Sequence, residues 1–126
     1  MILFFDENIP PKVAASLQAL GSCEARHLVD HLPRGTPDEQ VLAFLAEREW
    51  FLITQDYRIK RNPHERQALM QAGVGAFILT GRSDRSKEEM MIFILECLPE
   101  IAELAKSTER PFIFGISDRQ KFERLG

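Results

Sequence analysis

The sequence predicts an α/β fold, a three-layer α/β/α sandwich in which helices cover both faces of a mostly parallel sheet. Two observations lead to this prediction. First, continuous apolar runs at residues 2–5, 51–54 and 74–80 are typical of strands buried on both faces. Second, the segments between them carry apolar residues at helical spacing and begin with a proline or a capping residue. Strands that alternate with helices in this way indicate right-handed βαβ units.

The first part of the chain alternates strand and helix. The strand at residues 2–5 is followed by two prolines that open a helix, and Gly21 ends that helix. A weaker strand is expected at residues 23–29, where charged residues interrupt the apolar ones. The apolar stripe of the helix consists of Val13, Leu17 and Leu20.

A second helix is expected to begin in the segment Thr36-Pro37-Asp38-Glu39. Thr36 can cap it, Pro37 can occupy its first position, and Glu39 can complete a capping box. The second strong strand follows at residues 51–54. The apolar stripe between them suits a helix packed on a sheet, and consists of Val41, Leu42, Leu45 and Ala46.

The remaining elements follow the same rules. A third helix is expected to begin at Asn62-Pro63 and to end at Gly73, before the strand at residues 74–80. Ser86 is followed by Glu at the position of a capping box, which opens the longest helix.

That longest helix is expected at residues 87–106, and Pro99 inside it should kink or divide it. A final strand is expected at residues 111–116. Residues 121–125 either pair with this strand as a hairpin or form a frayed tail.

The length and composition of the chain fit one domain. The chain has 126 residues, which is near the commonest domain size, and it carries no linker, repeat or low-complexity tract. We therefore expect residues 1–126 to form a single domain. No apolar run approaches the roughly 20 residues that span a bilayer, and no signal peptide precedes the first strand. We expect a cytoplasmic protein without membrane contact.

The charge is small in total and uneven in distribution. A net charge of −3 argues against binding nucleic acid by bulk charge alone. A local basic rim can still neutralise phosphates, although a solvated loop is the competing explanation. The densest basic group is Arg58, Lys60 and Arg61, and a second group is Arg82, Arg85 and Lys87.

Three acidic signals stand where a strand ends or a helix begins. Asp6-Glu7 follows the first strand, Asp38-Glu39 opens the second helix, and Asp56 follows the second strong strand. An open α/β sheet places its ligand crevice outside the carboxyl ends of its strands, so these acids are expected to meet there. Carboxylates in one cleft repel each other, so the cluster needs a cation among them or a raised pKa. A hard divalent cation is the natural occupant.

Each signal also has a purely structural explanation. Asp6 can cap the first helix, Asp38 and Glu39 favour the positive end of a helix dipole, and Asp56 can form a turn. Taken alone, the Asp38-Glu39 pair is explained equally well by either role. The convergence of all three signals at one edge of the sheet favours a site.

The segments that carry these signals resemble a known family. Residues 4–8 (FFDEN), 36–39 (TPDE), 53–59 (ITQDYRI) and 61–66 (RNPHER) are similar to PIN domains. The resemblance is closer to the short PIN-like toxins, VapC-like, of prokaryotic type II toxin–antitoxin systems. It covers residues 1–80 well and the rest of the chain in outline.

The resemblance implies a PIN-like fold and a ribonuclease that cleaves RNA phosphodiester bonds endonucleolytically with Mg²⁺ or Mn²⁺. Asp6, Asp38 and Asp56 would bind the metal, and Glu7 or Glu39 would bind a second metal or orient the attacking water. The implied partners are an RNA substrate and a cognate antitoxin protein, and we also consider a homodimer.

Other residues would complete such a site. Arg58, Lys60 and Arg61 would follow the RNA backbone, while Tyr57 would either stack on a base or pack locally. The family usually has a further Glu before the second helix, and this chain offers Asp30 or Glu7 in its place. The missing acid leaves a PIN-like module that binds RNA or protein without cleaving as an alternative.

A phosphoacceptor receiver domain is the alternative from another class. It would also use acids after the first strand, together with Asp56 and Thr80 at later strand ends. Receivers need a Lys at the end of the last parallel strand, where residues 115–117 of this chain are Gly-Ile-Ser. They also have no use for Asp38.

Overall fold

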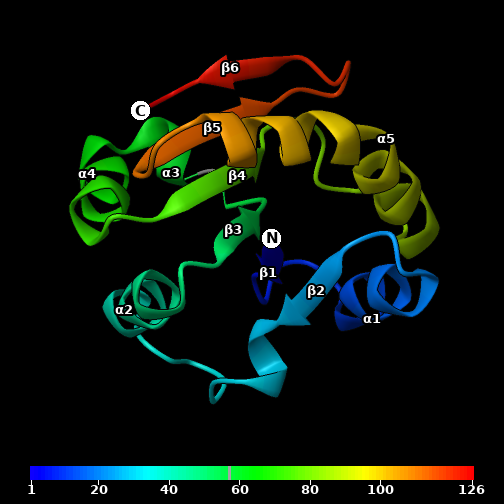
Figure 1. Cartoon of the computed structure of the whole chain (residues 1–126), viewed down its shortest axis with the longest axis horizontal. Helices are drawn as coiled ribbons and strands as arrows, with labels where there is room; N and C mark the ends of the chain where they lie inside the picture. Colours follow the sequence, from blue (N-terminus) through cyan, green and yellow to red (C-terminus); the bar gives the residue numbers. More distant parts are fainter. Residues whose placement is uncertain (57) are drawn as a thin grey trace.

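The computed structural model describes residues 1–56 and 58–126, in which strands and helices alternate (Figure 1). The strands are β1 (Ile2–Phe5), β2 (Glu24–His27), β3 (Phe51–Thr54), β4 (Gly75–Leu79), β5 (Phe112–Ile116) and β6 (Phe122–Arg124). The helices are α1 (Pro11–Leu20), α2 (Asp38–Arg48), α3 (Arg58–Arg61), α4 (Pro63–Ala72) and α5 (Lys87–Ser107), with a 3₁₀ helix at Leu28–Asp30.

The strands form one mixed sheet in the order β2-β1-β3-β4-β5-β6. The first five are parallel, and β6 is antiparallel to β5, so residues after 120 pair as a hairpin. The strand order reverses at β1, where Phe5 pairs with His27 of β2 on one side and with Ile53 of β3 on the other. Such a reversal opens a crevice outside the carboxyl ends of the strands. The predicted mostly parallel α/β sheet is confirmed.

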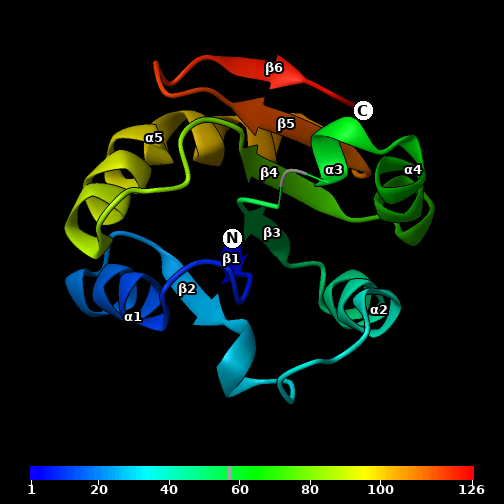
Figure 2. The same cartoon turned by 180° about the vertical axis from the view of Figure 1, so that it is seen from behind.

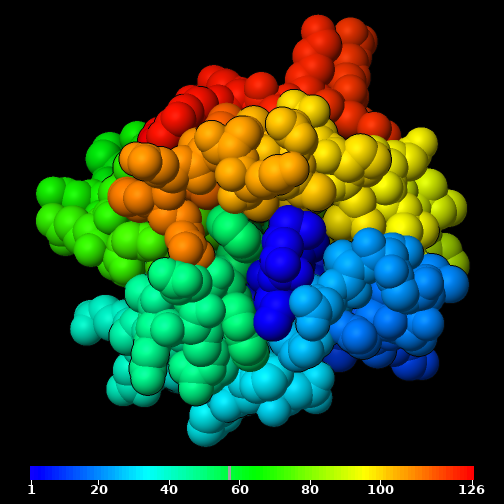
Figure 3. Space-filling view, in the orientation of Figure 1, coloured from blue at the N-terminus to red at the C-terminus, as the bar shows by residue number. Residues whose placement is uncertain are grey.

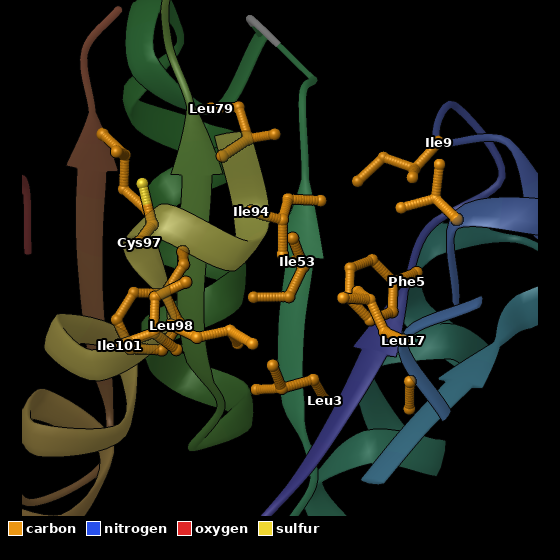
Figure 4. Close-up of a cluster of buried hydrophobic side chains, with 14 of the residues drawn as sticks. Leu3, Phe5, Ile9, Leu17, Ile53, Leu79, Ile94, Cys97, Leu98 and Ile101 are labelled. Atoms are coloured by element: carbon orange, nitrogen blue, oxygen red, sulfur yellow. The ribbon is translucent and has the colours of Figure 1, made fainter. Parts of the chain in front are cut away.

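Helices cover both faces of this sheet, as predicted. Figures 1 and 2 show α1 and α5 on one side, and α2 and α4 on the other. Successive residues of each strand point to opposite faces, so Leu3 and Phe5 join one buried cluster while Phe4 joins the other. Figure 4 shows the first cluster, in which Ile94 of α5 packs near Ile53 of β3. Each such side chain contributes about 1.5–3 kcal/mol when fully buried.

The first helix confirms its predicted ends but not its whole stripe. α1 has proline at its first position, and Gly21 ends it in the left-handed region at φ 73°. Leu20 is 62% exposed, so its predicted burial is wrong. The buried residues of α1 are Val13, Ala14 and Leu17. Because Ala14 is among them, the centre of the buried stripe lies away from Leu20 in the last turn.

The start of α2 differs from the prediction. The helix begins at Asp38 with Pro37 as its N-cap residue, and no side chain caps it. The predicted capping box is therefore wrong. The hydroxyl of Thr36 donates to the carbonyl of Pro33 instead, and Glu39 occupies the second helical position, one residue short of the box. Asp38 becomes the first residue of the helix.

The C-terminal half agrees closely with the prediction, and of the two alternatives for Pro99 the division of the helix is not found. The capping box of α5 is present, because Ser86 Oγ accepts from the N–H of Glu89 and the Glu89 carboxylate accepts from the N–H of Ser86. Pro99 lies inside α5 on its exposed side and does not divide the helix, which curves over the sheet (Figure 1). The segment between β5 and β6 projects from the surface (Figure 3). Within the described residues, no helix has the length and apolar character needed to cross a bilayer.

Candidate functional site

Asp6 directly follows β1, and its carboxylate is fixed by short contacts. Its backbone N–H donates to the carbonyl of Ile53 in β3 (3.0 Å), which extends the pairing of the two strands. Oδ1 accepts from the N–H of Glu7 (2.8 Å), and Oδ2 accepts from the hydroxyl of Thr54 (2.9 Å). The side-chain amide of Asn8 lies 3.4 Å from the same Oδ2. The orientation of Asp6 is therefore set by both strands.

Thr54, the last residue of β3, connects the two loops that carry acids. It is fully buried. Besides donating to Asp6, its hydroxyl accepts from the N–H of Asp56 (3.1 Å) and from the amide of Asn8 (3.1 Å). Asn8 also accepts from both the backbone N–H (3.2 Å) and the side-chain amide (2.6 Å) of Gln55. Neither Thr54 nor Asn8 was among the predicted site residues, which were chosen for their charge.

The carboxylate of Asp56 is bound by the side chain of Arg58. Nε of Arg58 lies 3.0 and 3.1 Å from the two oxygens, Nη2 lies 2.7 Å from Oδ2, and the backbone N–H donates to Oδ1 at 3.0 Å. These hydrogen bonds hold the pKa of Asp56 below its ordinary value, although burial acts in the opposite direction. The Asp56 side chain is only 18% exposed, whereas Arg58 is 64% exposed.

Asp38 lies near the same guanidinium. Its Oδ2 lies 3.8 Å from Nη2 of Arg58, and its side chain is 67% exposed. Arg58 therefore lies between the carboxylates of Asp38 and Asp56. We expected a cation or a raised pKa among the acids, and in this structure the cation is Arg58. The sequence interpretation had placed Arg58 in a loop directed at RNA, and the structure places it in helix α3 with its side chain on the acids.

The three predicted metal-binding acids line two adjoining cavities. The first, which we call the acidic cleft, has a volume of about 400 Å³. Its lining consists of Asp6, Glu7, Asn8, Asp38, Gln55, Asp56 and Arg58. The second, which we call the apolar hollow, has a volume of only about 50 Å³. It shares with the acidic cleft the four acids Asp6, Glu7, Asp38 and Asp56. Its apolar lining consists of Leu28, Val41, Leu42, Leu52, Ile59 and Leu69.

Glu65 is an acid that sequence reasoning did not place at the site. It lies at the third position of α4, is half-buried, and lines the apolar hollow with Asp6, Asp38 and Asp56. Its charge also acts on Arg58. The sequence interpretation treated Glu65 as part of a helix start, and only the packing of α4 beside α2 brings it to the acids.

The other predicted acids divide into two groups. Glu7 is exposed and lines both cavities. Glu39 and Asp30 are exposed, and neither is among the described residues that line the acidic cleft or the apolar hollow. Of the two candidates for the missing family acid, the structure thus places Glu7, and not Asp30, beside Asp6.

Two of the predicted RNA-binding residues lie on the surface of α3. Lys60 and Arg61 are exposed, while Ile59 between them and Arg58 is buried and anchors the helix. Tyr57, the candidate for base stacking, lies outside the described residues.

The second basic group is largely neutralised by acids. Arg82 pairs with Asp84 (2.8 Å) and Glu89 (3.1 Å), and Arg85 pairs with Asp118 at 2.6 Å with its own side chain 5% exposed. These arginines connect the segment after β4 to α5 and to the segment after β5.

The acids fit a divalent cation by their chemistry but are not arranged around one. Within residues 1–56 and 58–126, no three His, Cys, Asp or Glu side chains are grouped so as to hold a metal ion. Both oxygens of Asp56 are engaged by Arg58, and Asp38 extends toward solvent. The donors are nevertheless carboxylate oxygens, which Mg²⁺ and Mn²⁺ prefer, and a cationic group already lies between two of them.

A comparison with protein families identifies a match for most of the chain. A family model described as a PIN-like domain matches residues 1–81, which include β1 to β4 and every residue of the acidic cleft. Comparisons with curated proteins and with solved structures found no match.

Proposed function

This chain belongs to the PIN-like domain family, and from that membership we propose that it is a nuclease that cleaves RNA with a divalent cation. The observation that carries the proposal is the acidic cleft at the carboxyl ends of β1 and β3, lined by acids from three separate segments. Acids in this arrangement have no role in packing the core, because the cleft opens to solvent. Family membership also favours the nuclease over a receiver domain.

The residues that would hold Mg²⁺ or Mn²⁺ are Asp6, Asp38 and Asp56. Bound there, the cation would lower the pKa of a water ligand and offset negative charge on the phosphate. Asp6 is already oriented by Thr54, and Glu7, which lines the cleft, would accept a proton from the attacking water.

RNA is the proposed substrate, and α3 is the proposed contact for its backbone. Lys60 and Arg61 are exposed on the same short helix as Arg58, which lines the otherwise acidic cleft. Each phosphate contact made by these residues should contribute roughly 0.7 to the slope of log affinity against log salt. Replacing Lys60 and Arg61 by Gln should flatten that slope.

The test is cleavage of a panel of single-stranded and structured RNAs with Mn²⁺, with Mg²⁺ and with EDTA. Asp6→Asn and Asp56→Asn should each lower cleavage by at least about a hundredfold, because each removes a charge that supports the transition state. Glu39→Gln is the matched control, since it removes the acid next to Asp38 but outside the cleft, and it should retain activity. RNA binding without metal-dependent cleavage would favour the alternative of a non-cleaving PIN-like module.

The finer proposal is that this nuclease is the toxin of a toxin–antitoxin pair, with a protein antitoxin as its partner. What supports it is the resemblance of segments such as residues 4–8 and 53–59 to short PIN-like toxins. Induced expression should arrest bacterial growth, and Asp56→Asn should relieve the arrest. Cleavage in vitro without any effect on growth would leave the nuclease proposal standing and reject the toxin.

A further inference from the structure

We propose that Arg58 occupies the cation position of the acidic cleft, and that its guanidinium must leave Asp56 before a divalent cation can bind. This inference rests on the proposed metal-dependent function and deepens it. It assigns to one residue two successive partners, first the carboxylates and then the RNA backbone.

The contacts show why the two cations exclude each other. Nε and Nη2 of Arg58 together engage both oxygens of Asp56 at 2.7–3.1 Å. A divalent cation needs at least one of these oxygens with a free lone pair directed at it, and it would also be repelled by the guanidinium. The same positive group lies 3.8 Å from Asp38 and is attracted by Glu65.

The two halves of the cleft differ in how firmly they are held. Asp6 is fixed by the backbone N–H of Glu7 and the buried hydroxyl of Thr54. Neither group is charged, so neither competes with a metal ion for the carboxylate. Asp56, in contrast, is bound by a charged side chain that is 64% exposed. The carboxylate of Asp6 can therefore bind a metal ion without displacing another cation, whereas the carboxylate of Asp56 is already paired with Arg58.

Arg58 can move without disturbing the fold. It is the first residue of a four-residue helix that is anchored by buried Ile59, and its own side chain faces solvent for most of its surface. Once displaced, the guanidinium, which shares α3 with Lys60 and Arg61, would be available to phosphate oxygens. Metal loading and RNA binding should therefore strengthen each other, since linkage between two sites is reciprocal.

The first test measures Mn²⁺ binding by the electron paramagnetic resonance of free Mn²⁺, without any cleavage assay. Arg58→Ala should bind Mn²⁺ about three- to tenfold more tightly than the wild-type protein, because it removes both the ion pair and the repulsion. Lys60→Ala is the matched control, since it removes the same charge from the same helix, whereas the hydrogen bonds and the ion pair that Asp56 makes with α3 all come from Arg58, and it should change affinity less than twofold.

The outcomes separate this inference from the proposed function. Equal or weaker Mn²⁺ binding by Arg58→Ala would overturn the role of Arg58, while loss of binding in Asp56→Asn would still support the metal site. Absence of Mn²⁺ binding in the wild-type protein and in all variants would reject the metal site and the inference together.

A second test observes Arg58 directly in the folded wild-type protein. The Nε–H resonance of Arg58 should shift and exchange faster with water when Mg²⁺ saturates the cleft, because its acceptor oxygens are withdrawn. The Nε–H of Arg82, which donates to Asp84 at 2.8 Å, is the internal control and should not respond. An unchanged Arg58 resonance, while other cleft residues report Mg²⁺ binding, would overturn the inference.

Discussion

Arg58 and Asp56 are two residues apart, and their contact sets the electrostatics of the cleft. Three carboxylates at one sheet edge repel each other, and a single guanidinium between two of them offsets part of that repulsion. The direction of the pKa shift at Asp56, which is downward, agrees with this account.

Arg58→Ala should lower the free energy of unfolding near pH 7 by about 0.2–1 kcal/mol, the usual range for an exposed ion pair. The folded pKa of Asp56 is depressed, so the stabilisation is present above the ordinary carboxyl pKa and is lost as pH falls through the lowered value. The difference between wild type and variant should thus shrink as pH is lowered from 7 toward about 2. Urea unfolding at a series of pH values measures it, with Lys60→Ala as control. A difference that stays constant to the lowest pH would contradict this account.

Thr54→Val should lower the free energy of unfolding by about 1–3 kcal/mol, because it keeps the shape but removes the buried hydroxyl that bonds Asp6, Asn8 and Asp56. Thr54→Ser keeps the hydroxyl and loses a methyl group, so about 0.8 kcal/mol is expected. Urea unfolding of both variants distinguishes the two effects. Equal stability of the Val and Ser variants would show that the hydroxyl does not connect the loops.

The residues of the cleft show what can be predicted from sequence at this scale. Asp6 and Asp56 follow strands directly, so the rule for the carboxyl edge of a parallel sheet was enough to bring them together. The contact of Arg58 with Asp56 depends on a side-chain conformation, and the position of Glu65 depends on helix packing. Neither the side-chain conformation nor the helix packing can be predicted from the order of residues along the chain.

At the scale of elements, strong periodicity and helix-ending glycines predicted the helices and strands reliably. The first residue of a helix was predicted less reliably. Both Gly21 and Gly73 end helices in the left-handed region, as predicted. The start of α2 was misplaced by one residue because Thr36 bonds backward to Pro33 rather than forward. The four-residue helix α3 is shorter than any periodic pattern can reveal.

Pro99→Ala should raise the free energy of unfolding by about 2–2.6 kcal/mol. A proline inside a helix removes a backbone hydrogen bond at a cost of about 3 kcal/mol, while the more flexible unfolded chain of the Ala variant offsets about 0.4–1 kcal/mol. Pro99 is exposed, so little packing is lost. Thermal and urea unfolding measure the change, with Glu100→Ala at the next exposed position as control. Destabilisation would mean that the curvature of α5 needs the proline.

At the scale of the whole molecule, the core extends beyond the segment that matches the family. The match ends at residue 81, yet one buried cluster includes residues from Leu3 through Ile116. α5 covers the face of β3 and β4 opposite α2 and α4, and β5 pairs with β4 along its whole length. We therefore propose that the chain folds as one domain.

A fragment of residues 1–81 should not fold cooperatively, because it would expose the apolar face that α5 and β5 cover. Buried Phe77 and Leu79 would then face water. The measurement is near-ultraviolet circular dichroism followed through urea unfolding, with the full chain as the reference that should give a single transition. A cooperative transition in the fragment would divide the chain into two units.

The short spacing of Arg58 and Asp56 has a consequence for the order of events during folding. Asp6 and Asp56 meet only when β1 pairs with β3, which requires closing a long loop of chain. Arg58 accompanies Asp56 from the start, because the two are close in the unfolded chain as well. Asp56 thus approaches Asp6 with a guanidinium two residues away, which reduces the repulsion between the two carboxylates while the strands join.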